Sequence, residues 1–385
     1  MTDISAVGSS SLDTWSASLD DDEGRAASAP TARGESTRDL SELPELPDAN
    51  AGLLARAARA ASPPRLLLAT GIASGDVANV DSAATPIPPV QRRLDAFRAA
   101  ATPTYRLPDG SEVKVAAPFR MPARQERELT PAEKRDDTSL RYATQEGRVE
   151  GHKGELAAIA SKVGIGAGGL IALYNGRGTP QQVHALTQAL LDAGKLPVDD
   201  GKASAGTRVR QMMCDYGLGF DCAGYTQQAF LSARGLTRAQ AGFANPTSEG
   251  LFELSPAHFT RVAPENAGPG DIVALGPPAG ETVGHRAIIA DRHELTAAEL
   301  QRFGCTAPER AVLAAGHVTV FAVDSSWGSG ADPSRGGVER HTWLYDSTTG
   351  LWGTVGAGET GTVRLSGLPY GNHPLRGIYH YAGSP

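Results

Sequence analysis

The sequence has 385 residues, of which 40% are apolar, and its formal net charge at pH 7 is -7. A chain of this length and apolar content can bury a substantial core. The negative charge balance excludes the strongly basic surface that nucleic-acid-binding proteins carry, so no nucleic-acid partner is expected. Three cysteines do not make a disulfide framework, and at least one thiol must stay unpaired.

The first residues, MTDISAVGSSSLDTWSASLDDDEG, contain neither the basic start nor the apolar stretch of a signal peptide. No window approaches the about 18 consecutive apolar residues of a transmembrane helix. We therefore expect a soluble protein made in the cytoplasm, with no transmembrane segment, that would leave the cell only by a non-classical route. The sequence indicates no oligomeric state.

Residues 1–135 are rich in Ala, Ser, Pro, Arg and acidic residues and hold only four aromatic side chains: Trp15, Phe97, Tyr105 and Phe119. So few large apolar groups cannot form an ordinary core, which predicts a mostly disordered N-terminal segment. Two short helices are predicted within it, at residues 51–61 and 90–100.

Residues 138–200 have the three- and four-residue spacing of apolar positions that predicts helices, as in ELAAIASKVG. A later helix is predicted to begin at Thr179 as N-cap, with Pro180 at its first position, and to end at Gly194. GIGAGG, which lies before it, matches the G-x-G-x-x-G pattern, but a helix and not a strand precedes it. A helix–helix turn is favoured over a dinucleotide site, and the segment is expected to be a small helical module.

Residues 202–385 are richer in aromatic and β-branched residues. Strands are predicted at GDIVALG, HRAIIAD, HVTVFAV, GVERHTWLY, GTVRLSGL and GIYHYA. One helix is expected after Cys222 and another over residues 295–315. A leading helix followed by an antiparallel sheet predicts an α+β domain.

Cys222 lies in GFDCAGYTQQAFLSARG, just where a helix is expected to begin. The positive end of a helix dipole and free N–H groups would lower the pKa of this thiol, with Asp221 as N-cap. Gly219 and Gly224 are expected to leave room for a substrate beside the sulfur. The alternative is a packed core thiol, since free cysteines are often buried.

A catalytic cysteine needs a base, and the base needs a residue that orients it. His285 begins a predicted strand after a loop, and Asp324 ends the next one. Cysteine on a helix start, histidine on one strand and aspartate on the next form a papain-like arrangement.

These segments resemble NlpC/p60-type peptidases. YGLGFDCAGYTQQAFLSARG is similar to the family's nucleophile segment, GPGDIVALG to its Pro-Gly-Asp strand, GHRAIIAD to its histidine strand and FAVDSSWGSG to the strand that follows. The resemblance covers about residues 205–345. It implies a papain-like cysteine hydrolase domain with Cys222 as nucleophile, His285 as base and Asp324 as orienting residue.

Tyr216 would then lie near the oxyanion, as a tyrosine upstream of the cysteine does in the family; packing on the loop is the alternative. The sequence departs from the family pattern at Ala223, at Arg286 and in the long insertion between His285 and Asp324. The insertion is predicted to be helical, and it weakens the assignment of Asp324 most.

The resemblance implies hydrolysis of an amide bond in a peptide, most readily a peptidoglycan peptide. The long polar N-terminus without a visible signal peptide suits an exported effector. Two alternatives stay open: a papain-like deamidase or acyltransferase acting on a protein or lipid, and a non-catalytic binding module of the same fold. No cofactor is implied. A metal site is not expected, because His293-Glu294 begins like the H-E-x-x-H motif but lacks its second histidine.

Overall fold

The computed structural model describes residues 89–120, 137–243, 257–277, 284–328, 336–356 and 361–383, with the backbone alone for 137–147. Its helices are α3 (Pro89–Ala100), α4 (Asp137–Lys162), α5 (Ala167–Tyr174), α6 (Pro180–Asp192), α7 (Ala205–Asp215), α8 (Cys222–Arg234), the 3₁₀ helix η1 (Pro264–Asn266), α9 (Ala297–Arg302) and α10 (Ala307–Ala315). Its strands are β1 (Thr104–Arg106), β2 (Glu112–Lys114), β3 (Phe259–Val262), β4 (Ile272–Leu275), β5 (His285–Glu294), β6 (Val318–Trp327), β7 (Gly337–Asp346), β8 (Leu351–Val355), β9 (Val363–Leu365) and β10 (Leu375–Tyr381).

Eight strands form one sheet in the order β3-β10-β4-β5-β6-β7-β8-β9, and β1 and β2 pair separately. Every neighbouring pair in the large sheet is antiparallel. Helices together with an antiparallel sheet confirm the α+β class. All six predicted strands are present, whereas β1, β2, β3 and β8 were not predicted.

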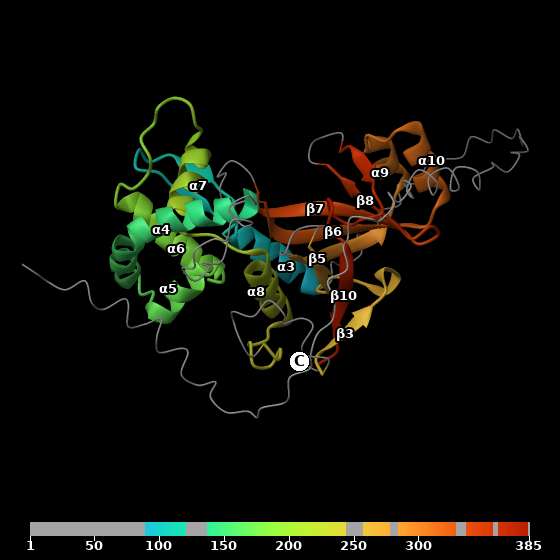
Figure 1. Ribbon diagram of the computed structural model, residues 1–385, viewed down its shortest axis with the longest axis horizontal. Coiled ribbons are helices and arrows are strands. Elements are labelled where there is room, and N and C mark those ends of the chain that lie inside the picture. Colours follow the sequence, from blue (N-terminus) through green and yellow to red (C-terminus); the bar gives the residue numbers. More distant parts are fainter. Residues whose placement is uncertain are drawn as a thin grey trace, which may run out of the picture. The chain divides into compact units, whose positions relative to one another are not determined.

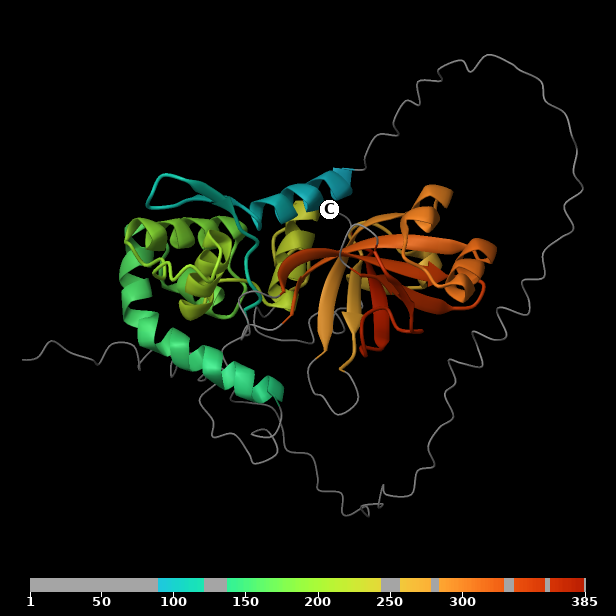
Figure 2. The same ribbon diagram turned by 90° about the horizontal axis from the view of Figure 1, so that it is seen from above.

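The large sheet is buried on both faces in its centre. Along β5, Ile288 and Ala290 belong to the core that includes α3 and α8, whereas Ala287 and Ile289 pack into a tryptophan-rich core on the opposite face. We call these the helix face and the tryptophan face. Alternation along a strand sends successive side chains to opposite faces. Figures 1 and 2 show α3 and α8 beside each other against the sheet.

The predicted helical module corresponds to α4, α5 and α6. Thr179 caps α6 in a capping box with Gln182, and Pro180 is the first residue of the helix, as predicted. The GIGAGG run turns the chain from α4 into α5, with Gly164 at a φ of 74°. None of the helices in the described ranges is long and apolar enough to cross a membrane.

The predicted helical insertion lies between β5 and β6, but as two helices where one was expected. Thr296 begins α9 and Thr306 begins α10, each with a capping box. Pro308, in the first turn of α10, has no N–H to continue a preceding helix. The two helices cover a separate small core that includes Phe303 and Leu313.

Residues 89–120 depart from the predicted disorder. The helix predicted at residues 90–100 is present as α3, and Phe97, Tyr105 and Phe119 are all buried. These side chains pack against elements far along the sequence, a contribution that local composition does not reveal. The prediction is therefore wrong for this stretch. The remainder of residues 1–135, with the helix expected at 51–61, lies outside the described residues.

Candidate active site

Cys222 is the first residue of α8, as the sequence predicted. Asp221 precedes it in extended conformation as N-cap, and its carboxylate accepts a hydrogen bond from the N–H of Gly224. Arg177 lies 3.6 Å from the same carboxylate, and both side chains are almost fully buried. The helix start is thereby fixed against the rest of the chain, and α8 packs on β5 and β6.

The two glycines predicted to leave room for a substrate are used differently. A Cβ at Gly219 would collide with the backbone carbonyl of Pro118, and one at Gly224 with the carbonyl of Gly176. At both positions the absence of a side chain therefore lets another backbone segment of the same chain approach closely. The expectation of open space beside the sulfur at these positions is wrong.

Burial raises the pKa of Cys222 to about 12, and the neighbouring Asp221 carboxylate adds to the rise. The other influences oppose it: the backbone N–H groups of Arg286 and Ala223 and the positive charge of Arg286 all favour the thiolate. The predicted lowering of the pKa is thus wrong for the described state, because burial outweighs the helix start. Among the polar groups, these three favour the thiolate, whereas the Asp221 carboxylate opposes it.

The three cysteines should differ in their rates of alkylation. Burial raises the pKa of Cys214 and of Cys222 to about 12, and it also raises the pKa of Cys305, which lies half-buried at the insertion as Cys222 does at the start of α8. Only the thiolate reacts, so we expect iodoacetamide at pH 8 to label Cys305 first. Mass spectrometry of the three cysteine-containing peptides over time measures the order. Fastest labelling of Cys222 in the natural chain would contradict the strongly raised pKa of its thiol.

His285 begins β5 as predicted, but its side chain lies on the tryptophan face. It pairs with Leu275 of β4, which belongs to the tryptophan-face core. Its ring stacks on Trp327 with centroids 4.4 Å apart and lies 5.9 Å from Tyr370 and 6.3 Å from His373. The Nε2 atom is buried without a hydrogen-bond partner among the described residues. On the helix face, the strand presents Arg286, not His285, toward Cys222.

Burial lowers the pKa of His285 to about 3, with further lowering from His373, His341 and Arg286. An imidazole whose pKa in the folded state lies below its ordinary value contributes stability above pH 6.5, and this contribution is lost as the pH falls toward 3. Between these limits His285 should account for about 1.4 kcal/mol of unfolding free energy per pH unit.

Replacing His285 by glutamine, which does not titrate, should therefore flatten the loss of stability between pH 6 and pH 4. Urea unfolding at several pH values, followed by tryptophan fluorescence, measures the slope. His317 is exposed, so His317→Gln is the matched control and should keep the slope of the natural chain. An unchanged slope in His285→Gln would show that His285 is not buried as a neutral ring.

Asp324 lies on the helix face, because it pairs directly with Ile288. Its carboxylate accepts two hydrogen bonds from Arg340, from Nε at 2.7 Å and from Nη2 at 2.8 Å. Arg98 of α3 approaches the same carboxylate at 4.0 Å, and Arg340 also bonds Asp95 of α3. Through these ion pairs, Asp324 and Arg340 link α3 to the sheet. Asp324 lies on the opposite face from the imidazole that it was predicted to orient.

Tyr216 follows the end of α7 and turns toward α4. Its hydroxyl donates a hydrogen bond to Glu155, and its ring stacks on His152 with centroids 4.2 Å apart. Burial and the Glu155 carboxylate raise its pKa. Because the hydroxyl is bound to Glu155, the structure favours the packing alternative over the oxyanion role.

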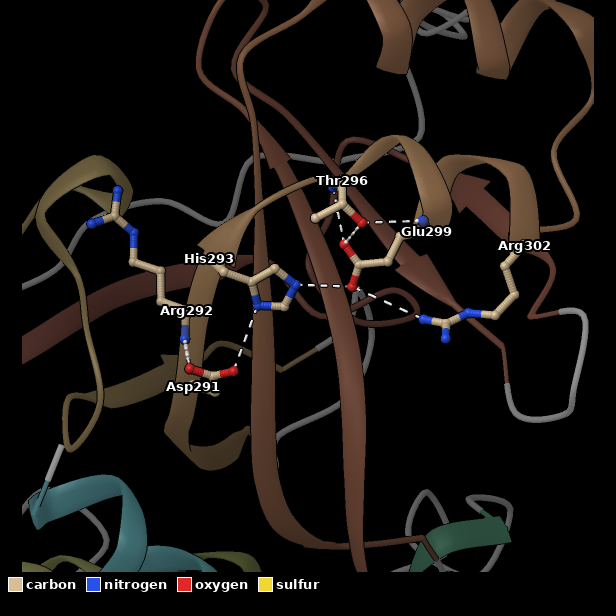
Figure 3. Close-up of polar contacts among 6 residues, drawn as sticks. All are labelled: Asp291, Arg292, His293, Thr296, Glu299 and Arg302. Carbon is tan, nitrogen blue, oxygen red and sulfur yellow. Dashed lines mark hydrogen bonds and ion pairs between the residues drawn. The ribbon is translucent and has the colours of Figure 1, made fainter. Parts of the chain in front are cut away.

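His293, which begins the incomplete H-E-x-x-H motif, is held by polar contacts near the end of β5. Figure 3 shows its ring between two carboxylates, with Nε2 at 2.9 Å from Glu299 and Nδ1 at 3.5 Å from Asp291. Glu299 is itself held by Thr296 in the cap of α9. Over the described ranges no three His, Cys, Asp or Glu side chains are arranged to hold a metal.

No protein-family model, no curated protein sequence and no solved structure matches this chain. The resemblance to NlpC/p60-type peptidases is therefore a hypothesis carried by the quoted motifs.

Two residues beside Cys222 were not predicted as part of its site. Phe119 packs against Cys222 from a stretch expected to be disordered. Arg286 had been noted only as a departure from the family pattern. Once the orientation of β5 is known, strand alternation places Arg286 on the helix face. The sequence alone does not reveal whether His285 or Arg286 faces α8.

Proposed function

We propose that the chain is a cysteine hydrolase with a papain-like domain, and that Cys222 is its nucleophile. The observation that carries the proposal is the position of Cys222 at the first residue of α8, where the N–H groups of Ala223 and Arg286 and the charge of Arg286 act on its sulfur. These groups favour a thiolate once the sulfur is no longer buried.

In the proposed reaction the thiolate attacks the carbonyl carbon of an amide. The N–H of Cys222 itself, at the start of α8, would donate to the developing oxyanion. The C–N bond then breaks, the amine leaves with a proton taken from water, and a second water hydrolyses the thioester to release the acid and the free thiol. The base that the resemblance assigns, His285, faces the other side of the sheet, so the proposal rests on Cys222 and not on an assembled triad.

The proposed substrate class, by resemblance, is a peptide of the bacterial cell wall. Action as an exported effector belongs to the same proposal. A deamidase or acyltransferase would use the same nucleophile on a protein or lipid, and assays with those substrates separate the two.

Digestion of purified muropeptides with the full chain, followed by mass spectrometry, tests the proposal. The expected result is a pair of fragments whose masses sum to that of the parent plus one water. The Phe119 variants described below should also be incubated for a long time with muropeptides, proteins and lipid amides. If all of these substrates stay intact, the proposal is contradicted.

A binding module of the same fold is the second candidate. The observation that favours it is the raised pKa of Cys222, since a neutral thiol is a poor nucleophile. This candidate predicts binding of muropeptides without turnover, and it predicts that exposure of the thiol creates no activity.

A further inference from the structure

Residues 117–120 run across the start of α8 and are bonded on both sides. The carbonyl of Ala117 accepts from the N–H of Val338 in β7 at 2.9 Å. On the other side, the N–H of Phe220 donates to the carbonyl of Pro118 at 3.1 Å, and the N–H of Arg120 donates to the carbonyl of Phe220 at 2.8 Å. Phe220 lies two residues before Cys222, so this segment lies beside the thiol.

Phe119 packs against Cys222. Its side chain is only 8% exposed, and it forms a small apolar cluster with Cys222 that is separate from the main cores. The segment therefore supplies apolar surface beside the thiol. Its contact with the thiol accounts for part of the burial that keeps Cys222 protonated.

Two glycines permit the close approach of this segment. At Gly219, with a φ of 148°, a Cβ would meet the carbonyl of Pro118; at Gly337, with a φ of 104°, it would meet the carbonyl of Ala117. A side chain at either position would push the backbone away from Cys222. The close packing on both sides indicates that residues 117–120 are held firmly between β7 and the residues that precede α8.

We propose that residues 117–120 are an autoinhibitory strap, which holds Cys222 latent by covering its sulfur with Phe119. The inference rests on the proposed function, in which Cys222 is the nucleophile. Displacement of Phe119 hydrates the sulfur and leaves the thiolate-favouring contacts from α8 and Arg286 in place. The residue that covers the Cys222 thiol is thus Phe119, which lies about 100 residues earlier in the same chain.

The test is the alkylation rate of Cys222 in the full chain with Phe119→Ala and Phe119→Val, measured by peptide mass spectrometry with iodoacetamide at pH 8. We expect about a tenfold or greater increase for Phe119→Ala and a smaller one for Phe119→Val, because a shorter side chain covers less of the sulfur. The valine variant keeps the measurement decisive should the alanine variant fail to fold.

Phe303→Ala is the matched control, since Phe303 is 6% exposed and packs near Cys305 instead. It should leave the rate of Cys222 unchanged. Cys222 rates within about twofold of the natural chain in the folded Phe119 variants would overturn the strap. Fast labelling without hydrolysis of muropeptides, proteins or lipid amides would keep the strap and refute the hydrolase, so the two proposals fail separately.

Discussion

Replacing Cys222 with alanine is expected to abolish hydrolysis, both in the natural chain and in the Phe119→Ala background. The alanine side chain offers no nucleophile, so no acyl intermediate forms, and the loss should be about 10³-fold or more. Rates of fragment release from muropeptides, followed by mass spectrometry, measure it. The Phe119→Ala background matters because its thiol is uncovered.

Cys305→Ala is the control for this experiment. Cys305 lies in the insertion that α9 and α10 form, packed against the small core there. Its removal takes away a thiol without touching the start of α8, so activity should stay within about twofold of the parent. Activity that survives Cys222→Ala would assign the chemistry to another residue.

Replacing Arg340 with glutamine is expected to lower the unfolding free energy by about 3–5 kcal/mol. Asp324 is 1% exposed and depends on Arg340 for both of its close hydrogen bonds. Burial already raises the pKa of Asp324, and Arg340 holds it down. Without that guanidinium the carboxylate must stay charged in an apolar site or take up a proton. Urea unfolding at pH 7 measures the loss.

The double variant Asp324→Asn/Arg340→Gln should recover much of this stability, because neither charge is then left unpaired. Arg364→Gln, at an exposed position of β9, is the matched control and should cost less than about 0.5 kcal/mol. A double variant no more stable than Arg340→Gln would show that the pair does not act as a unit. Loss of activity in Asp324→Asn at unchanged stability would restore a catalytic role to Asp324.

Local patterns predicted the elements of the fold well. The alternating apolar runs that include Ile288 and Val323 predicted strands that are present, and Thr179-Pro180 predicted the start of α6. The glycine-rich turn and Asp221 placed Cys222 at the first residue of α8. These features depend on residues close together in the sequence, which is why the sequence reveals them.

The arrangement of the site depends on long-range features. Successive strand residues face opposite sides, so the orientation of β5 decides whether His285 or Arg286 turns toward α8. The ion pair of Asp324 needs Arg340 from the next strand and α3 from far upstream. Phe119 lies in a segment with few aromatic residues, and its burial comes from distant partners. None of these contacts leaves a local pattern.

The most direct test of Cys222 as nucleophile is mass spectrometry of the Phe119→Ala variant quenched with acid during muropeptide turnover. A thioester adds the mass of the acyl fragment to one cysteine. The account predicts that this mass appears on the peptide that contains Cys222 and disappears when Cys222→Ala is added. Turnover with no adduct on Cys222, or with an adduct at Cys214 or Cys305, would contradict it.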